Sequence, residues 1–465
     1  MLEQVLRDID QSHDASLNAL KEFLAIPSIS TSPEHKADCR RCAQWAANKL
    51  SAIGFAATAR DTPGHPVVVA KNTHQPGRPT VLVYGHYDVQ PPEPLDPWVS
   101  PPFEPTVRKT PDGHDAIYAR GAVDDKGQTW AHMYALAMWQ KHGGVPVNIT
   151  FIIEGEEEVG SPNLAPFIAA NKDELKCDVA LVSDTQQFAR GIPAITYGLR
   201  GLVYMEVKVT GADHDLHSGL YGGAVPNPAN ILCEILATLH DQSGKVMIEN
   251  FYDGVIPLTA GERAEWKKLP FNDEKFFADL KLSSGFGEAG YSTIERKWAR
   301  PTCDINGLTS GYQGPGAKTI IPSSASAKVS MRLVPNQDPK NIAEAFTRHI
   351  ERVKSEKGWK GVKVEVHAHS SAPPALVPTD GPAVQCALKA MEIGFGEKPT
   401  LMREGGSIPI VSTFKSLLEV DTLLVGFGLP DDRIHSPNEK FDLDALFKGT
   451  RTLAALYALL GSLKT

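Results

Sequence analysis

The segment IIEGEEEVGS holds the densest group of residues that could do chemistry in this sequence. Its four carboxylates, those of Glu154, Glu156, Glu157 and Glu158, directly follow an apolar run. Carboxylates that share a dry site repel one another, and bound cations would cancel that repulsion. Adjacent side chains in an extended segment point apart, so one glutamate could bind a metal ion while its neighbour faces a metal-bound water. A solvated acidic loop is the alternative interpretation.

Two further pairs have residue types suited to the same chemistry. His86 and Asp88 lie two residues apart in the apolar segment VLVYGHYDV, so both side chains would leave one face of a strand. A metal-bound imidazole usually gives its other N–H to a carboxylate, which this pair could supply. Asp124 and Asp125 lie between glycines in RGAVDDKG, where one carboxylate could bridge two cations. The alternatives are a structural histidine and an aspartate that caps the following helix.

Asp184 and His435 complete the set of candidate donors. Asp184 ends the apolar segment DVALVSD, and His435 lies in a polar loop after the apolar segment TLLVGFG. Histidine and carboxylate donors without cysteine favour a catalytic zinc site over a structural one. The five candidate ligands of a two-metal site are His86, Asp124, Glu158, Asp184 and His435.

The elements that must position these residues alternate between strands and helices. Apolar segments at 81–89, 147–155 and 178–184 predict strands, and QTWAHMYALAMWQKH (128–142) predicts a helix. Each predicted strand ends in polar residues. This order predicts an α/β fold with a mixed, largely parallel sheet and a site at the carboxyl edge of that sheet.

The pattern changes near residue 196. Apolar and polar residues then alternate with period two, which is typical of antiparallel strands with one buried face. The alternating segments are 202–211, 324–335 and 362–369. We therefore expect residues 196–372 to form an inserted α+β domain, and residues 1–195 plus 373–465 to form one catalytic domain.

Composition and charge exclude several classes of protein. The 465 residues are 42% hydrophobic and 22% charged, as in globular proteins, which rules out intrinsic disorder. A net charge of −8 without a basic run argues against a nucleic-acid partner. No apolar stretch is long enough for a membrane span, and the acidic N-terminus is unlike a signal peptide, so we expect a cytoplasmic protein. Cys39 and Cys42 are expected to be packed thiols on a helix.

A set of motifs occurs in order between about residues 80 and 440. They are GHYDVQP, ARGAVDDKG, EGEEEVGS, the aspartate after LVS, DLHSGLYGG, MRLVP, REGGSIP and IHSPNEK. Together they resemble the M20 metallopeptidases, and within that family the branch of cytosolic non-specific dipeptidases and carnosinases. The resemblance implies a phosphorylase/hydrolase-like catalytic domain with an inserted dimerisation (lid) domain, in agreement with the breaks near 196 and 372.

The resemblance also implies a role for each candidate in the catalytic domain. It assigns His86 and Asp184 to one metal ion, Glu158 and His435 to the other, and Asp124 to both. A cis peptide bond would join Asp124 to Asp125, and Asp88 would orient the first histidine. Matching EGEEEVGS on its final Gly-Ser selects Glu157 as the general base and Glu158 as the ligand.

The inserted domain is implied to contribute substrate-binding residues. The histidine that matches His217 stabilises the oxyanion in the active site of the other subunit. Arg332, with Ser407 and the backbone of Gly406, would receive the substrate carboxylate. Thr319 would assist from the partner subunit.

The implied activity is hydrolysis of dipeptides by a hydroxide that bridges two divalent ions. Zinc is the expected ion, with manganese and cobalt as alternatives. Family members with Asp at the position of Asp184 tend to cleave dipeptides, whereas those with Glu tend to be carboxypeptidases or deacylases. The alternatives are an N-acyl amino acid deacylase, such as a desuccinylase or deacetylase, and a silent dimeric binding protein. The expected partners are a dipeptide substrate and a second copy of the chain.

Overall fold

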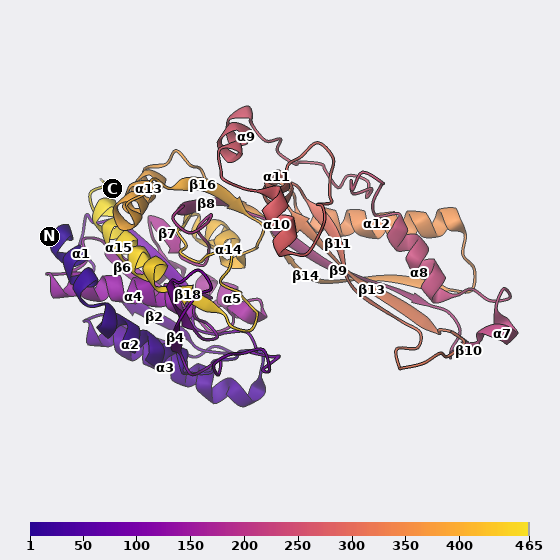
Figure 1. The fold of residues 1–465 in the computed structure, drawn as a ribbon, viewed down its shortest axis with the longest axis horizontal. Helices are drawn as coiled ribbons and strands as arrows, with labels where there is room; N and C mark the ends of the chain where they lie inside the picture. Colours follow the sequence, from indigo (N-terminus) through magenta and orange to yellow (C-terminus); the bar gives the residue numbers. More distant parts are fainter. Residues whose placement is uncertain (464–465) are drawn as a thin grey trace. The chain divides into compact units, whose positions relative to one another are not determined.

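The computed structural model describes residues 1–463 and divides into two compact units (Figure 1). Unit 1 comprises Met1–Tyr197, Val377–Met402 and the described residues from Ile408; unit 2 comprises Gly198–Leu376 and Arg403–Ser407. The division at residues 198 and 376 lies two to four residues from the sequence-based boundaries. The sequence assigns 403–407 to the catalytic domain, whereas the structure groups it with unit 2.

The largest sheet lies mostly in unit 1. Its strands are β1 (Ala56–Arg60), β2 (Val67–Lys71), β3 (Thr80–His86), β6 (Asn148–Glu154), β7 (Val179–Val182), β8 (Ala194–Leu199), β15 (Ala375–Leu376), β16 (Thr400–Glu404) and β17 (Thr422–Leu424). They follow the order β1-β2-β6-β3-β7-β17-β8-β15, with β16 paired to β8. The central pairs β6–β3, β3–β7 and β7–β17 are parallel, and the pairs toward both edges are antiparallel. The predicted mixed α/β fold is confirmed.

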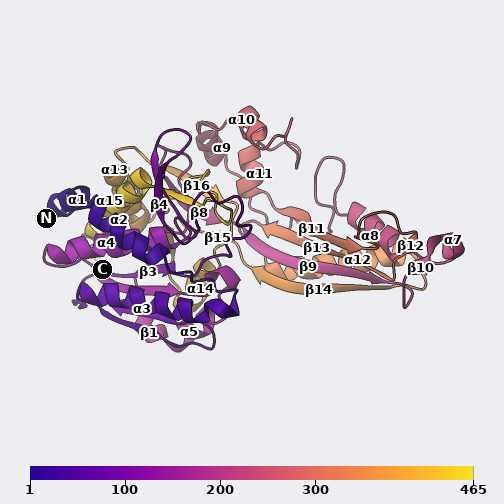
Figure 2. The ribbon, with the colours of Figure 1, turned by 60° about the horizontal axis from the view of Figure 1, so that its bottom comes forward.

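Helices cover both faces of this sheet (Figures 1 and 2). They are α1 (Leu2–Gln11), α2 (His13–Leu24), α3 (Lys36–Ala52), α4 (Lys126–Lys141), α5 (Leu164–Ala170), α6 (Lys172–Leu175), α13 (Pro382–Phe395), α14 (Pro409–Leu418) and α15 (Leu443–Leu460). Val81 and Val83 of β3 pack in the core with α4 and α15, whereas Tyr84 meets Phe414 of α14 on the other face. Because side chains alternate along a strand, a strand buried on both faces is apolar throughout, which explains its continuous apolar sequence.

Unit 2 is built on an antiparallel sheet in the order β11-β13-β9-β14 (Figure 2). Its strands are β9 (Gly201–Thr210), β11 (Thr302–Ser310), β13 (Ser324–Leu333) and β14 (Lys363–Ala372), and its helices are α7 (Ser218–Tyr221), α8 (Pro228–Ala237), α9 (Ala260–Lys267), α10 (Asp273–Asp279), α11 (Thr293–Ala299) and α12 (Pro339–Lys357). The alternating apolar residues of β9 and β13 pack against α8 and α12 in a separate core. The period-two pattern predicted this single buried face.

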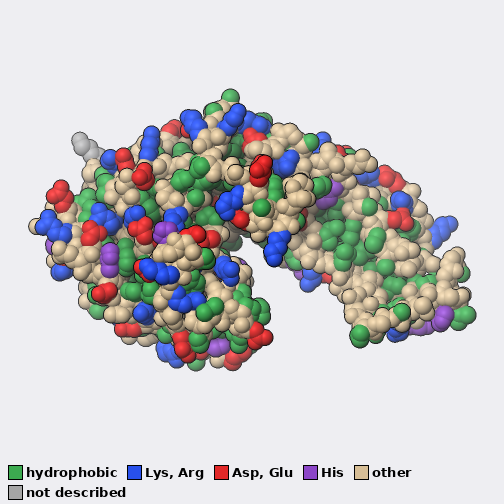
Figure 3. Space-filling model, viewed as in Figure 1, with side chains coloured by type: hydrophobic (Ala, Val, Ile, Leu, Met, Phe, Trp, Pro, Cys, Tyr) green, Lys and Arg blue, Asp and Glu red, His purple; other side chains and the backbone are tan. Residues whose placement is uncertain are grey.

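Two small sheets complete the fold. One pairs β10 (Leu216–His217) with β12 (Ile320–Ile321), and the other has the order β18-β5-β4, formed by Lys440–Asp442, Asp115–Tyr118 and Thr106–Lys109. Cys39 and Cys42 are buried free thiols on α3, as expected. Among the described helices, none has the length and apolar character that a membrane crossing requires. The surface drawn in Figure 3 intersperses acidic and basic side chains over unit 1.

Candidate metal centre

The carboxyl ends of the central strands bring the candidate donors together in unit 1. His86 is the last residue of β3 and lies in register with Glu154, the last residue of β6. Asp184 follows β7, Asp124 precedes α4, and His435 lies in the loop between β17 and β18. Because parallel strands end at one edge of a sheet, these positions converge although they are far apart in the sequence.

Two groups of donors share Asp124. His86, Asp124 and Asp184 form one group and Asp124, Glu158 and His435 the other, with the donor atoms of each group within 4.8 Å of one another. Asp124 Oδ1 lies 3.2 Å from His86 Nε2, and its Oδ2 lies 2.9 Å from His435 Nε2. His435 Nε2 is also 3.2 Å from Glu158 Oε2. Each oxygen of Asp124 therefore faces a different histidine.

The donors fit a pair of divalent ions. His86 Nε2 is fully buried and, although it lies 3.2 Å from Asp124 Oδ1, it makes no hydrogen bond of good geometry among the described residues. Buried polar atoms in native proteins are nearly always partnered, so this nitrogen points to a ligand. Two imidazoles and three carboxylates are donors that zinc and similar divalent ions accept.

Asp88 connects the first histidine to the acidic loop. His86 Nδ1 lies 3.1 Å from the carbonyl oxygen of Asp88 and 3.3 Å from its Oδ1. The two carboxylate oxygens of Asp88 accept hydrogen bonds from the backbone N–H groups of Glu157 (3.2 Å) and Glu158 (3.0 Å). The regular strand β3 ends at His86, two residues earlier than Asp88. Asp88 thus holds the imidazole and the acidic loop at once, and the sequence predicted only the first contact.

The four acids of EGEEEVGS differ in the groups that they contact. Glu154 Oε1 accepts hydrogen bonds from Tyr84 and Ser161, and Glu156 accepts from Asn163. Glu158 belongs to a donor group. Glu157 and Glu158 both lie in the short 3-10 turn Glu157–Val159 that follows β6.

The charges of the centre depend strongly on burial and on one another. Burial raises the pKa of Glu157 to about 8, and the carboxylates of Asp124 and Glu158 contribute to the rise. Burial also raises the pKa of Asp184 well above its usual range. Hydrogen bonds to Asp124 and Glu158 raise the pKa of His435 to about 10. Burial opposes the ionised form of Asp124, but its two histidines outweigh this and lower its pKa. Divalent cations among these groups would relieve the repulsion between the acids.

Asp125 belongs to neither donor group but forms hydrogen bonds beside the centre. The peptide bond between Asp124 and Asp125 is cis, as the resemblance implies. Asp125 Oδ2 accepts hydrogen bonds from Thr129 Oγ1 (2.8 Å) and from the backbone N–H of His86 (3.2 Å). It precedes α4 but makes no side-chain capping bond to that helix. The helix-capping alternative therefore does not describe this aspartate.

A second set of candidates lies together in unit 2. Arg332 Nη1 donates to Ser407 Oγ (3.0 Å), and Ser407 Oγ donates to the carbonyl oxygen of Arg200 (2.5 Å). Arg200 Nε in turn donates to the carbonyl oxygen of Gly405 (3.1 Å). Gly406, between them, is exposed. These contacts explain why 403–407 joins unit 2, and they leave the guanidinium of Arg332 without an ion-pair partner in the described part of the chain.

His217 and Thr319 are neighbours at another place in unit 2. His217 pairs with Ile320 across β10 and β12, and the N–H of Ser218 donates to the carbonyl of Thr319 (3.1 Å). His217 Nδ1 accepts a hydrogen bond from the N–H of Gly219 (3.0 Å), so a neutral imidazole carries its proton on Nε2. Both side chains are exposed.

Comparison with known proteins decides the family. The sequence pattern of Peptidase family M20/M25/M40 matches residues 82–458. This chain belongs to that family. It is 32% identical to the human Beta-Ala-His dipeptidase over 98% of this chain and 92% of the relative. The predicted membership of the M20 metallopeptidases is confirmed.

Solved M20 structures share the whole fold. That of the di-peptidase Dug1p from Saccharomyces cerevisiae has a TM-score of 0.87 at 29% identity, covering 100% of this chain and 99% of that one. The M20 family metallo-carboxypeptidase Sso-CP2 from Sulfolobus solfataricus has a TM-score of 0.85 at 33% identity, covering 96% and 99%.

Three residues of this M20 chain were not singled out from the sequence although they contact the candidates. Gln90 Nε2 donates to Glu158 Oε2 (2.8 Å), Arg200 holds the Gly405 carbonyl, and Glu439 holds the backbone before Asp124. Gln90 and Glu439 lie inside the motifs GHYDVQP and IHSPNEK, which was the available signal. The sequence has no local feature that marks Arg200.

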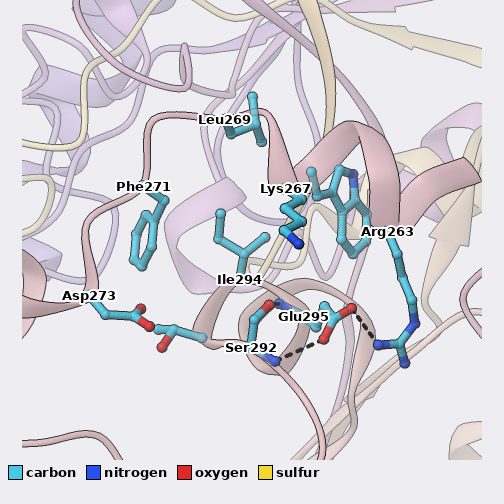
Figure 4. A pocket seen from close by; sticks show the side chains of 10 residues that line it. Arg263, Lys267, Leu269, Phe271, Asp273, Ser292, Ile294 and Glu295 are labelled. Carbon is cyan, nitrogen blue, oxygen red and sulfur yellow. Dashed lines mark hydrogen bonds and ion pairs between the residues drawn. The ribbon is translucent and has the colours of Figure 1, made fainter. Parts of the chain in front are cut away.

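Unit 2 also contains a hollow of about 390 Å³ between α9, α10 and α11 (Figure 4). Trp266, Phe271 and Ile294 are among the side chains that line it. Of its two acids, Glu295 already accepts a hydrogen bond from the N–H of Ser292 and pairs with an arginine, and Asp273 is exposed.

Proposed function

We propose that this M20 chain is a dinuclear-metal dipeptidase. The observation that carries the proposal is the carboxylate of Asp124, which belongs to both donor groups and turns one oxygen toward each histidine. The relatives that match over the whole chain include a Beta-Ala-His dipeptidase and the di-peptidase Dug1p. These names support dipeptides as the substrate class.

The two donor groups are the proposed ligand sets, with zinc as the proposed ion and manganese or cobalt as alternatives. When bound, such ions acidify a water molecule and polarise the scissile carbonyl group. Asp88 keeps the first histidine and the acidic loop in place through the contacts described above. Gln90 does the same for Glu158.

Glu157 is the proposed general base. It lies beside the donors, yet its carboxylate belongs to neither donor group. Burial and neighbouring carboxylates let it hold a proton near neutral pH. In its ionised form Glu157 would take a proton from the attacking water, and the raised pKa would favour keeping that proton until the leaving amine accepts it.

The residues of unit 2 are proposed to bind the substrate. Arg332 and Ser407, with the exposed backbone of Gly406, would hold the carboxylate of the dipeptide, because a planar guanidinium suits a carboxylate. His217 would donate Nε2–H to the oxyanion, since its Nδ1 is already occupied. We propose that His217 and Thr319 do so in the active site of a second copy, within a homodimer formed through the inserted domain.

A substrate screen on apoprotein reloaded with zinc, manganese or cobalt tests the proposed activity. Free dipeptides should be cleaved, and blocking the C-terminal carboxylate should abolish most of the turnover because Arg332 then lacks its partner. Efficient removal of single C-terminal residues from longer peptides would show a carboxypeptidase instead. Failure to cleave any dipeptide with any of the three ions would refute the proposal.

The deacylase alternative is not favoured, because the relatives named above are two dipeptidases and a carboxypeptidase, and none of them is named as a deacylase. Hydrolysis of succinylated or acetylated amino acids, with free dipeptides left intact, would revive it. A silent binding protein would have lost a donor or the base, whereas all are present here. Cytoplasmic location and dimerisation remain parts of the proposal, which cell fractionation and sedimentation would test.

A further inference from the structure

Glu439 is a fully buried acid whose carboxylate binds the loop that leads into Asp124. Glu439 Oε2 accepts hydrogen bonds from Arg120 Nη1 (2.8 Å) and from the N–H of Gly121 (3.0 Å). Its Oε1 accepts from the N–H groups of Val123 (3.1 Å) and Asp124 (3.2 Å). Four donors from one loop therefore converge on a single side chain.

This loop has no other source of hydrogen bonds for those N–H groups among the contacts of the described residues. It lies between β5 and α4 and forms no strand or helix of its own. A buried backbone N–H without an acceptor costs about 1–3 kcal/mol, so three such groups would open or reshape the loop. The carboxylate of Glu439 therefore accepts the hydrogen bonds that backbone carbonyl groups accept in a helix or a sheet.

The pairing of β18 with β5 puts Glu439 in this position. Lys440 pairs with Tyr118, and the N–H of Ala119 donates to the carbonyl oxygen of Glu439 (3.2 Å). Four residues earlier on the same segment, His435 Nε2 lies 2.9 Å from Oδ2 of the Asp124 carboxylate. One segment thus touches the backbone of Asp124 through Glu439 and its side chain through His435.

We propose that Glu439 is a positioning residue of the metal centre, which fixes the backbone of residues 121–124 and thereby the place of Asp124 between the two ions. The proposal rests on the metal centre proposed above. Because Asp124 belongs to both donor groups, loss of Glu439 weakens the binding of both ions.

The variant Glu439→Gln tests this with little change of volume. A glutamine has one acceptor oxygen, and its amide nitrogen would face N–H donors on one side of the loop. We expect the dissociation constants of both zinc ions to rise by about 10–100-fold, as is typical when a residue that supports a metal ligand is lost. The measurement is competition between the apoprotein and a chromophoric chelator, with no substrate present.

Two variants serve as controls. Asp442 is also a buried carboxylate held by an arginine (Arg190) and two backbone N–H groups, but it caps α15 and does not contact residues 121–124. Asp442→Asn should leave both zinc constants within about 2-fold of the wild type, since none of its partners carries a ligand. Gln90→Ala removes a contact of Glu158 alone and should weaken one binding step only.

The outcomes separate clearly. A folded Glu439→Gln protein with wild-type zinc constants overturns the proposal, as does an equal loss of affinity in Asp442→Asn. If Glu439→Gln does not fold, Glu439→Asp retains both oxygens on a shorter stem and should weaken both steps less; wild-type constants there overturn the proposal equally. Absence of dipeptide cleavage by a wild-type protein that binds two zinc ions would refute the proposed function and leave this one standing.

Discussion

His132 should make the stability of unit 1 depend on pH. It is fully buried on α4, with Nδ1 2.8 Å from the Tyr457 hydroxyl and Nε2 2.8 Å from Ser183 Oγ. The Ser183 hydroxyl donates to the carbonyl of Val425 (2.6 Å), so it accepts from Nε2–H, and the neutral imidazole uses both nitrogens. Burial lowers the pKa of His132 to about 3.

The magnitude follows from that shift. A histidine in the unfolded chain has a pKa of about 6.5. Below that pH the unfolded chain therefore binds a proton that the native chain does not bind. Stability is therefore unaffected above about pH 6.5 and falls as the pH drops, by about 2 kcal/mol at pH 5 and about 4 kcal/mol at pH 3. For a unit of this size a loss of 2 kcal/mol lowers the melting temperature by roughly 3–4 °C.

The assay compares wild-type apoprotein with His132→Gln between pH 7.5 and pH 5, by unfolding followed through Trp130 and Trp139 on the same helix. The variant should be less stable at pH 7.5, and its deficit should shrink by about 2 kcal/mol at pH 5 because it lacks the titrating group. His367→Gln, at an exposed position, controls for the replacement of an imidazole. A stability difference between wild type and His132→Gln that stays constant over this pH range would refute the lowering of the His132 pKa by burial.

Three further predictions concern activity and metals. Glu157→Gln should lower kcat by about 10²–10⁴-fold while both zinc-binding steps persist, and retained turnover in a zinc-loaded variant would contradict its role as base. Arg332→Ala should raise KM for free dipeptides by roughly 10–100-fold, since a hydrogen bond to a charged group is worth about 1.5–3 kcal/mol. C-terminally amidated dipeptides, measured in parallel, should show little change, and an equal effect on both would argue against carboxylate binding. Chelation should abolish activity and lower the melting temperature of unit 1, because free metal at a thousand times its Kd stabilises by about 4 kcal/mol for each site. Activity and the original melting temperature should both return when metal is added. A melting temperature that chelation does not change would show that the ions do not bind in unit 1.

The sequence predicted much of this fold because the relevant signals are local. The period-two alternation of 202–211 reports a strand with one buried face, and the structure places β9 there. The continuous apolar run before His86 likewise reports a strand buried on both faces. Strand ends were less exact, since β3 stops before Asp88, where the chain turns toward the acidic loop.

What the sequence did not predict depends on contacts between distant segments. Glu439 binds N–H groups more than 300 positions away, and no periodicity or composition marks such a contact. The transfer of 403–407 to unit 2 similarly depends on Ser407 meeting Arg200 and Arg332, which are distant in the sequence. A motif could show that residues of the right type are present, but their partners are set only by the three-dimensional fold.

The interrupted course of unit 1 has a consequence for synthesis. Its core needs α15 (443–460), which packs against α1 and α4 from the other end of the chain. Unit 2 spans mainly residues 198–376 and has its own core, so it leaves the ribosome nearly whole before α15 is translated. Domains generally fold as units while the chain grows. The donor set of the metal centre is therefore complete only after His435 has been translated, later than nearly all of unit 2.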